Sequence, residues 1–346
     1  MSKKKPKDQL EGREELPAPH VSAEAHAAAG AAVDEGAPPS GDPNAPKGIL
    51  WIASYPKSGN TWTRALLNNL LKIIQDEDEG APQNINRMSE YTIWDISAKP
   101  YEKILGKPPK EAEREEIAKI RPQVQAQIAE RTDGLAMVKT HHALVMDRGV
   151  PAINFEVTSG AIYIVRNPLD VAISFANHLG STIDRAIHEM GIKNLETGVS
   201  EHSVYEIYGS WSQHVESWTR KPHRAIYVMR YEDMLEHPLE TFGGLARHLL
   251  LPATREQLEL AIQRSSFEEL RKQEEAEGYK EKPDSAEKFF RSGKAGEWRH
   301  TLTPDQVRQI VQDHHVQMAR FGYMIPELRP LLPGGAFANA WPAGVS

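Results

Sequence analysis

The chain has 346 residues, 40% of them hydrophobic and 26% charged, which is ordinary for a folded protein of one large or two modest domains. Its formal net charge of −7 argues against a general nucleic-acid-binding protein. The absence of cysteine excludes disulfides, thiolate metal sites and cysteine nucleophiles, and no apolar run approaches the roughly 18–20 residues that a membrane span needs.

Both ends of the chain have the composition of unstructured tails. The first residues, MSKKKPK, are basic, but acids, prolines and alanines follow them in place of the apolar run of a signal peptide. We therefore expect residues 1–46 to be a disordered tail and the protein to be cytoplasmic. Residues 328–346 are expected to form a C-terminal tail, which is rich in glycine, proline and alanine from position 333 onward. One folded domain is then predicted at residues 47–327.

Between the tails, short apolar runs alternate with stretches that have apolar residues at helical spacing. The run at 48–54 predicts a buried strand, and the pattern at 61–74 predicts a helix. The further predicted elements, in chain order, are a helix at 111–128, strands at 135–138 and 161–165, helices at 169–178 and 203–220, a strand at 225–229, and helices at 239–250, 255–263 and 304–320.

The loop between the first predicted strand and helix has the features of a phosphate site. A helix N-terminus presents unpaired backbone N–H groups and a partial positive charge, and Gly59 lets the backbone approach an anion closely. Ser58 and Thr61 add hydroxyl donors, and Lys57 adds a charge. The ATPase loop G-x-x-x-x-G-K-[ST] differs, because Asn60 stands here where that lysine would be.

The alternation of strands and helices predicts an α/β protein with a P-loop-like three-layer fold, in which helices flank a central, mainly parallel sheet. Ligands bind such sheets at the carboxyl ends of the strands. Kinases and ATPases need an acid there for Mg²⁺, but two of the predicted strands are followed by Lys139 and Arg166. A cationic site of this kind suits an anionic group donor that is handled without a metal, so no metal site is predicted.

Three segments resemble the signature motifs of the cytosolic sulfotransferases, and they occur in the expected order. Residues 55–62, YPKSGNTW, are similar to that family's YPKSGTTW. Residues 166–174, RNPLDVAIS, are similar to its RNPxDxxxS segment, and residues 289–298, FFRSGKAGEW, are similar to its FxRKGxxGDW segment. Smaller matches are KTH at 139–141, YEDM at 231–234 and SSF at 265–267. The resemblance covers about residues 48–325.

The resemblance implies an enzyme that transfers the sulfuryl group of 3′-phosphoadenosine 5′-phosphosulfate (PAPS) to an alcohol, a phenol or an amine. It also implies roles for single residues in binding this co-substrate. The 5′-phosphosulfate would be held by Lys57, Ser58, Gly59, Asn60 and Thr61; the adenine would lie near Trp62, Tyr231, Ser265 and Phe267; and the 3′-phosphate would be held near Arg166, Ser174, Arg291, Ser292 and Gly293.

Sulfuryl transfer needs a base for the acceptor's proton and cations for the departing phosphate. Histidine suits the base because its ordinary pKa lies near neutral pH. The resemblance places His141 as the base. Lys57 would then stabilise the leaving phosphate, with Lys139 as a further cation beside the histidine. His142 is the alternative base.

Three departures from the family pattern stand out. Asn60 replaces a threonine, but its backbone N–H still serves the phosphate loop. Ser292 replaces a lysine, which removes one cation near the 3′-phosphate. The family's dimer element KxxxTVxxxE corresponds to RxxxTPxxxR at 299–308, where proline removes a backbone donor and Arg308 reverses a charge. A homodimer would therefore have to form through another surface.

Several other side chains favour structural interpretations. We expect Trp211 and Trp218 to lie in the core and Asp170 to cap or pair near the segment at 166–174. His314 and His315 are expected at the surface of the last helix. The acids Glu274, Glu275 and Glu277 are expected to form a solvated face or a mobile lid.

The predicted function is in-line transfer of the sulfuryl group from PAPS to a hydroxyl of a small-molecule acceptor. A P-loop nucleotide kinase and a non-catalytic protein that binds PAPS or its product, 3′,5′-adenosine bisphosphate (PAP), are the alternatives. No nucleic-acid partner is predicted. The aromatic residues Trp94, Tyr91, Phe155 and Tyr279 would line an acceptor pocket or belong to the core.

Overall fold

The computed structural model describes residues 47–77, 80–132 and 134–333. At its centre lies a five-stranded sheet with the order β2-β3-β1-β6-β7, and every neighbouring pair of strands is parallel. Its strands are β1 (Gly48–Ser54), β2 (Ile93–Trp94), β3 (Leu135–Thr140), β6 (Thr158–Val165) and β7 (Ile226–Arg230). A separate antiparallel pair consists of β4 (Met146–Asp147) and β5 (Val150–Pro151).

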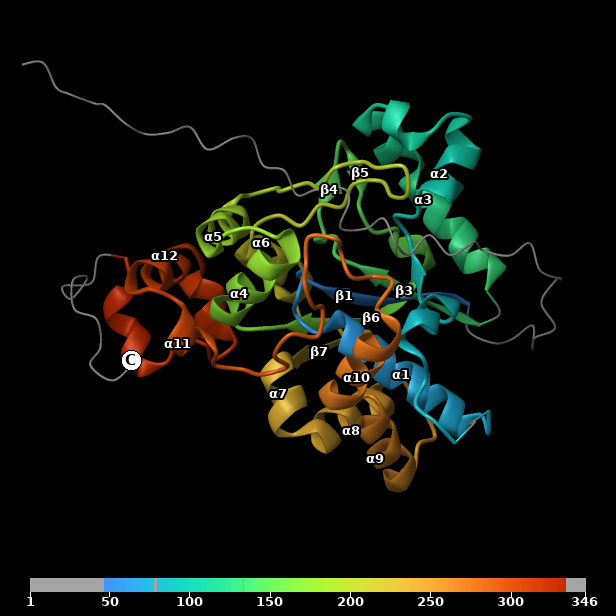
Figure 1. Cartoon of the computed structure of the whole chain (residues 1–346). Helices are drawn as coiled ribbons and strands as arrows, with labels where there is room; N and C mark the ends of the chain where they lie inside the picture. The colour runs from blue at the N-terminus through green and yellow to red at the C-terminus, as the bar shows by residue number, and fades with distance from the viewer. Residues whose placement is uncertain (1–46, 78–79, 133, 334–346) are drawn as a thin grey trace, which may run out of the picture.

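Helices cover both faces of this sheet (Figure 1). One face packs on α3 (Arg114–Arg131), α4 (Pro168–Leu179), α5 (Ile183–Gly191), α6 (Trp211–Thr219) and α12 (Pro304–Arg320). The other packs on α1 (Asn60–Ile74), α7 (Tyr231–Glu236), α8 (Pro238–His248) and α9 (Arg255–Arg264). The remaining helices are α2 (Ala98–Leu105), α10 (Phe267–Glu277), α11 (Trp298–Thr301) and the 3-10 turns η2 (Ile85–Glu90), η3 (Pro109–Glu111), η4 (Phe155–Val157) and η5 (Pro326–Leu331).

The central strand β1 is apolar from Ile49 to Ala53 because side chains on both of its faces are buried. Side chains of a strand point alternately to its two faces. Ile49, Trp51 and Ala53 enter the core under α3 and α4, whereas Leu50 and Ile52 enter the core under α1 and α8. All seven residues of β1 are buried, and the apolar run from Ile49 to Ala53 suits a strand that is covered on both faces. The predicted α/β fold with a parallel sheet between two helical layers is thereby confirmed.

The element predictions agree with the structure except for one long helix. The last helix has the predicted bounds, Pro304–Arg320, and the strands at 48–54, 135–138, 161–165 and 225–229 are all present. The helix expected at 203–220 is wrong, because only Trp211–Thr219 is helical. Gly209 has φ 61° and Ser210 caps α6 with its side chain. Upstream, the amide of Val204 donates to Ile96 O at 2.9 Å, so the backbone bonds across to another segment.

The described residues begin at the predicted N-terminal boundary of the folded domain and extend beyond its predicted C-terminal boundary. The tail expected at residues 1–46 lies outside the described residues, as do residues 334–346. The C-terminal boundary predicted at 327 is too early, because Leu328 and Leu331 in η5 are each 1% exposed and join the main core. Within the described ranges, no helix combines the length and the apolar composition that crossing a bilayer requires.

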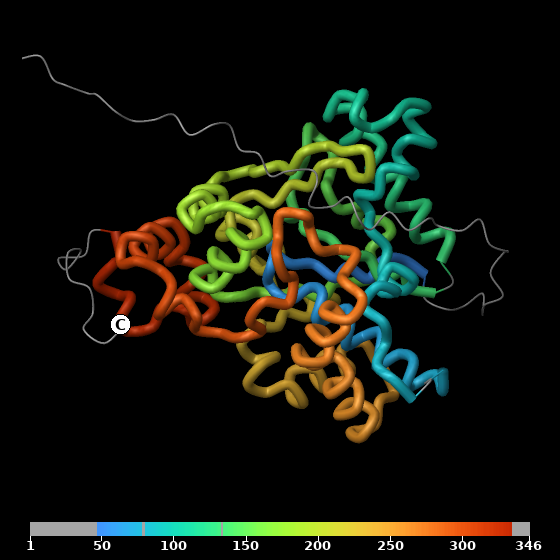
Figure 2. The backbone as a smooth tube through the Cα atoms, in the orientation of Figure 1, coloured from blue at the N-terminus to red at the C-terminus, as the bar shows by residue number. Residues whose placement is uncertain are grey.

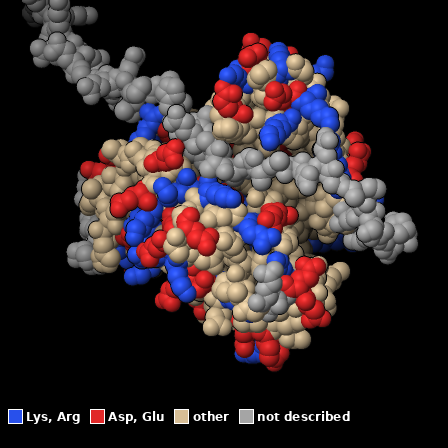
Figure 3. Space-filling model, turned by 45° about the vertical axis from the view of Figure 1, so that its right-hand side comes forward, with Lys and Arg blue, Asp and Glu red and all other residues tan. Residues whose placement is uncertain are grey.

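The surface carries charges of both signs. In the view of Figure 3, Lys and Arg alternate with Asp and Glu over the visible face, and neither sign forms one continuous field. This mixture of signs on the visible face fits the modest net charge of the chain.

Candidate functional site

A cleft lies at the carboxyl ends of the central strands, where a parallel sheet is expected to bind ligands. Loops that follow four strands line it, with Lys57 after β1, His141 after β3, Arg166 after β6 and Tyr231 after β7. The segment 278–297, between α10 and α11, passes across this edge of the sheet (Figure 2), and its residues Glu281 and 289–293 line the cleft. We call it the closing segment. Residues more than 200 positions apart in the chain thus meet at one site.

The loop after β1 is shaped to receive an anion. Lys57 and Gly59 have φ angles of 65° and 109°, which turn the chain sharply into α1. No side chain caps this helix, and its first turn holds no acidic residue. A Cβ on Gly59 would lie 2.8 Å from the Tyr231 ring, so glycine is required for this approach. The N-terminus of α1 therefore presents its backbone donors toward the cleft.

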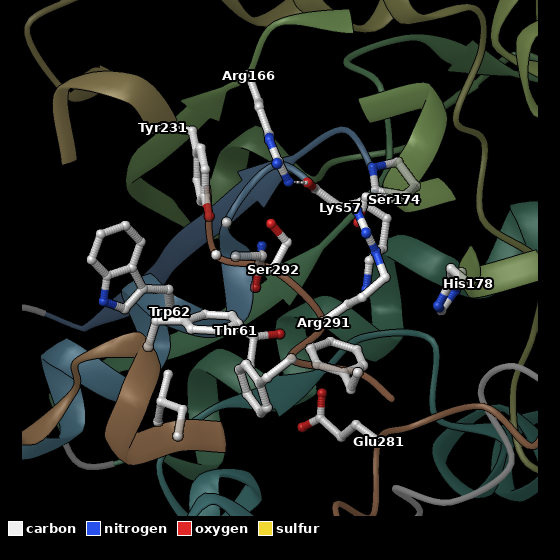
Figure 4. Close-up of a pocket in the computed structure, with 18 of the residues that line it drawn as sticks. Lys57, Thr61, Trp62, Arg166, Ser174, His178, Tyr231, Glu281, Arg291 and Ser292 are labelled. Atoms are coloured by element: carbon white, nitrogen blue, oxygen red, sulfur yellow. Dashed lines mark hydrogen bonds between the residues drawn. The ribbon is translucent and has the colours of Figure 1, made fainter. Parts of the chain in front are cut away.

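Arg166 connects the phosphate loop with the closing segment (Figure 4). Its Nη1 donates to Lys57 O at 3.0 Å and its Nη2 to Lys294 O at 3.1 Å. The guanidinium carbon lies 4.2 Å from the centre of the Tyr231 ring. Its Nε is buried without a hydrogen-bond partner among the described residues, and the residue lines the cleft. An unsatisfied buried donor of this kind suits a site that is completed by a polar ligand.

The Lys57 side chain lies in the cleft beside an aromatic ring and close to other positive charges. Its Nζ lies 3.7 Å from the centre of the Phe289 ring. Burial, and then the positive charges of Arg166 and Lys139, lower the pKa of Lys57 to about 7, with Glu274 acting in the opposite direction. Because burial and the neighbouring cations destabilise the charged form of Lys57, a bound anion would stabilise it.

His141 has a defined orientation and tautomer. Its Nδ1 lies 2.7 Å from Ser54 O, and a carbonyl oxygen only accepts, so Nδ1 carries the proton and Nε2 the lone pair. Its backbone is held as well, since its amide donates to Glu206 Oε1 at 2.8 Å and its carbonyl accepts from His214 Nε2 at 3.1 Å. The ring lines the cleft and packs edge-on against Tyr208. This tautomer is the one that a base acting through Nε2 needs.

The neighbouring His142 has a different environment. Its side chain is fully buried, and Nδ1 accepts a hydrogen bond from the amide of Ile207 at 3.1 Å. Burial lowers the pKa of His142 well below its ordinary value. Its carbonyl accepts from Trp218 Nε1 at 2.9 Å, which ties the residue into the core. The structure therefore gives His142 a packing role and gives His141 the position at the cleft.

Lys139 lies near the carboxyl end of β3, two residues before His141. Its Nζ lies 3.9 Å from the centre of the Trp94 ring and 3.7 Å from Glu281 Oε2. Burial lowers the pKa of this lysine, and the carboxylate of Glu281 opposes that effect. The sequence left open whether Trp94 lines a pocket or belongs to the core, and in the structure it lines the cleft.

The closing segment is fixed by carboxylates that accept backbone hydrogen bonds. Glu274 accepts from the amides of Phe289 and Phe290 at 2.7 and 2.8 Å. Asp170 accepts from the amides of Gly296 and Trp298 at 2.8 and 3.0 Å. The structural role expected for Asp170 is confirmed. The solvated role expected for Glu274 is wrong, because this carboxylate is buried against the closing segment, whereas Glu275 and Glu277 are exposed.

An aromatic wall occupies the other side of the cleft. Trp62 packs edge-on against Tyr231 with ring centres 5.8 Å apart, and Phe267 lines the same wall. Gly293 has φ 65°, and a Cβ on it would meet the Phe267 ring at 2.3 Å. The closing segment therefore lies directly on this aromatic side chain.

Most of the residues that the sequence predicted for the site line the cleft together. They are Lys57, Gly59, Asn60, Thr61, Trp62, Lys139, His141, Arg166, Ser174, Tyr231, Phe267, Arg291, Ser292 and Gly293. Ser265 is placed elsewhere, since it follows the last residue of α9 and its fully buried hydroxyl donates to Ala261 O of that helix at 2.8 Å. Ser58 is also fully buried and is absent from the lining of the cleft. Arg291 lines the cleft but forms an ion pair with Glu297 at 2.5 Å.

Residues that the sequence did not single out also line the cleft. Among them are His178, Tyr208, Leu235 and Glu281. Glu281 stands in the charged stretch YKEKPDS, where nothing in the local pattern distinguishes it from a solvated acid. Its importance comes from Arg64, 217 positions away, which only the fold brings to it.

The remaining side-chain predictions have mixed outcomes. Trp211 and Trp218 are core residues as expected, at 0% and 3% exposure. The surface position expected for His314 is wrong, because it is buried between α12 and α6, where Nδ1 lies 2.9 Å from Ser212 Oγ. Tyr279 belongs to a small core cluster and Phe155 is exposed.

Comparison with known proteins agrees with this geometry. The model of the sulfotransferase domain family matches residues 47–322. Sulfotransferase 1A1 of Canis lupus familiaris is 25% identical over 279 residues, which cover 79% of this chain and 84% of that protein. Flavonol 3-sulfotransferase of Flaveria bidentis is 25% identical over 278 residues, which cover 75% of this chain and 78% of that protein.

Solved structures show the same fold. Retinol dehydratase in a complex with retinol and PAP has a TM-score of 0.53 at 21% identity, covering 78% of this chain and 81% of that one. Mouse sulfotransferase SULT7A1 complexed with PAP has a TM-score of 0.50 at 18% identity, covering 80% of this chain and 88% of that one. At these identities the likeness concerns the arrangement of the sheet and its helices.

Proposed function

Because the chain belongs to the sulfotransferase domain family, we propose that it transfers the sulfuryl group of PAPS to a hydroxyl of a small alcohol or phenol. One observation carries the proposal: a single cleft joins an oriented histidine, His141, to the cations Lys57, Lys139 and Arg166. A base on one side of several cations is the arrangement that group transfer with an anionic leaving group requires. Two of the similar solved structures contain PAP, which supports PAPS as the co-substrate.

The described residues fit such a nucleotide. We propose that the backbone of the loop from Lys57 to Thr61 holds the 5′-phosphosulfate at the N-terminus of α1. Arg166, Ser174 and Arg291 hold the 3′-phosphate. The unsatisfied Nε of Arg166 and the close approach of Gly293 to Phe267 support this placement. The aromatic wall of Trp62, Tyr231 and Phe267 then packs around the adenine.

In this proposal the chain's own residues handle one proton and one developing charge. PAPS supplies the sulfuryl group and a phosphate leaving group. Nε2 of His141 accepts the proton of the acceptor hydroxyl, and Ser54 O stabilises the resulting imidazolium through Nδ1. Lys57 and Lys139 neutralise the negative charge that develops on the departing phosphate.

The acceptor is proposed to be a small molecule that enters beside Trp94 and Tyr208, which line the cleft near His141. The relatives named for small acceptors, including flavonol 3-sulfotransferase, support this class. Dimerisation through the family's C-terminal element is not proposed, since Thr303 and Pro304 begin α12 and Thr303 caps it. We retain the cytoplasm as the proposed location.

The test combines binding and turnover. The purified protein is titrated with PAP and with ATP plus Mg²⁺ by calorimetry, and a panel of alcohols and phenols is incubated with isotopically labelled PAPS and analysed by mass spectrometry. We expect PAP to bind much more tightly than ATP and at least one acceptor to gain a labelled sulfate. Binding of ATP with equal strength and no binding of PAP would refute the proposal in favour of a kinase. Binding of PAP without transfer to any acceptor would point to a non-catalytic protein.

A further inference from the structure

Glu281 is a buried carboxylate at the edge of the cleft that none of the family motifs includes (Figure 4). It belongs to the closing segment, and its side chain is only 7% exposed. Both carboxylate oxygens accept hydrogen bonds from Arg64, at 2.7 and 2.8 Å. A bidentate pair of this kind fixes the direction of the carboxylate as well as its position.

Arg64 connects this carboxylate to the phosphate loop. It lies on α1, one turn after Asn60, and its side chain is 0% exposed. A buried guanidinium without a counter-charge is strongly unfavourable, so Arg64 holds Glu281 firmly. The pair thus joins the closing segment to the helix whose N-terminus forms the proposed phosphate site.

The same carboxylate faces Lys139. Oε2 of Glu281 lies 3.7 Å from Lys139 Nζ, which also stacks over Trp94. The other charged groups around Lys139 are Arg64 on α1, Glu206 on the segment before α6, and Lys57 on the phosphate loop. Burial and Arg64 lower the pKa of Lys139, whereas Glu281 and Glu206 raise it. Glu281 is the nearest counter-charge on the closing segment.

We propose that Glu281 is a positioning residue, which holds the Lys139 ammonium in place and charged beside His141 while it joins the closing segment to α1. This inference rests on the proposed function. It adds a carboxylate to a site whose known motifs supply cations and a histidine. In this proposal, Arg64 fixes the orientation of the Glu281 carboxylate, and this carboxylate fixes the position of the Lys139 ammonium.

The variant that tests the proposal is Glu281→Gln, which keeps the shape and removes the charge. Because Glu274 still holds the closing segment, we expect PAP affinity to stay within about threefold of the wild type, while kcat falls about 10- to 100-fold near neutral pH. The alkaline limb of the rate profile should also move to lower pH, because Lys139 loses its proton more readily. Glu189→Gln is the matched control, since Glu189 is a buried carboxylate paired with Arg185 at 2.6 Å on α5. It should leave kcat and the pH profile unchanged.

A double variant separates positioning from simple charge balance in the fold. Arg64→Met with Glu281→Gln removes both members of the buried pair, which commonly restores stability. We expect its thermal stability to recover toward the wild type while kcat stays low. If kcat recovers together with stability, Glu281 merely neutralises Arg64 and the proposal is overturned. Unchanged kcat in Glu281→Gln overturns it as well.

A readout without turnover separates this proposal from the proposed function. Competitive labelling of Lys139 with acetic anhydride across pH, quantified by mass spectrometry, follows the charge of its amine. Loss of the Glu281 carboxylate should lower the pKa of Lys139 further in Glu281→Gln and raise the reactive fraction of its amine at a fixed pH. If the wild-type protein transfers no sulfate but the labelling shift is present, the proposed function fails and the link from Glu281 to Lys139 stands. An unshifted labelling profile overturns that link whatever the activity.

Discussion

Gly293 offers a sharp test of how the closing segment shapes the nucleotide site. We expect Gly293→Ala to weaken PAP binding for two reasons. Alanine at φ 65° costs about 1–2 kcal/mol of backbone strain. Its Cβ would also lie 2.3 Å from two atoms of the Phe267 ring, where ordinary contacts are about 3.5–4.0 Å, so the ring or the segment must move by more than about 1 Å.

The size of the effect follows from the proposed role of Phe267. Stacking of a base on an aromatic side chain is worth about 1–3 kcal/mol, which corresponds to a loss of about 5- to 150-fold in PAP affinity when the ring is displaced. The control is Gly296→Ala on the same segment. Gly296 has φ 81°, but a Cβ there has no atom of the described residues within 4 Å, so this variant carries the backbone strain without the clash.

The assay is calorimetric titration of both variants with PAP, together with urea denaturation. We expect similar losses of stability from the two backbone changes, but PAP affinity within about threefold of the wild type for Gly296→Ala only. If Gly293→Ala binds PAP as tightly as Gly296→Ala does, Phe267 is not part of the base site, and the placement of the adenine against the aromatic wall is refuted.

Three further predictions concern single side chains. His141→Ala should lower kcat about 10²- to 10⁴-fold while PAP binding persists in calorimetry, and full activity in this variant would exclude it as the base. Because burial and neighbouring cations lower the pKa of Lys57 to about 7, its charge is present below that pH and lost above it. PAP binding should therefore weaken about fivefold between pH 7 and 8 and take up a proton; Lys57→Met should abolish this dependence, and an equal dependence in the variant would show that another group titrates. Asp170→Ala leaves the amides of Gly296 and Trp298 without their acceptor, so the free energy of unfolding in urea should fall by about 2–4 kcal/mol; a change below about 0.5 kcal/mol would contradict the role assigned to this carboxylate.

Elements that depend on short-range sequence periodicity were predictable, whereas segments that depend on distant backbone partners were not. The apolar run of β1 and the helical spacing of α12 predicted their elements because both depend on short-range periodicity. The helix expected at 203–220 failed because Val204 and its neighbours pair with a segment more than 100 residues earlier in the chain. No local pattern reveals that partner, whereas Gly209 and Ser210 do carry a local signal for the true start of α6.

The candidate site shows the same division. Lys57, His141 and Arg166 were predictable, because each follows a strand, and the carboxyl ends of parallel strands converge at one edge of a sheet. The resemblance of the motifs added the aromatic wall and the 3′-phosphate residues as predictions. Ser265 was also predicted for the site, but its hydroxyl donates to a carbonyl of α9, the helix that ends one residue before it. A motif match fixes a position in the chain, and the local hydrogen bonds decide what the side chain does.

The sequence by itself determined the alternation of elements, the phosphate loop and the cationic strand ends, since these depend on residue type and on spacing over a few positions. Only the tertiary structure decided whether polar side chains such as Glu274, Glu281 and His314 are buried or exposed to solvent. Whether such a side chain is solvated or buried depends on the partner it meets, and these partners are brought in by packing. Arg64 and Glu281 stand 217 positions apart, and the helix and the closing segment that carry them meet only when the sheet is assembled.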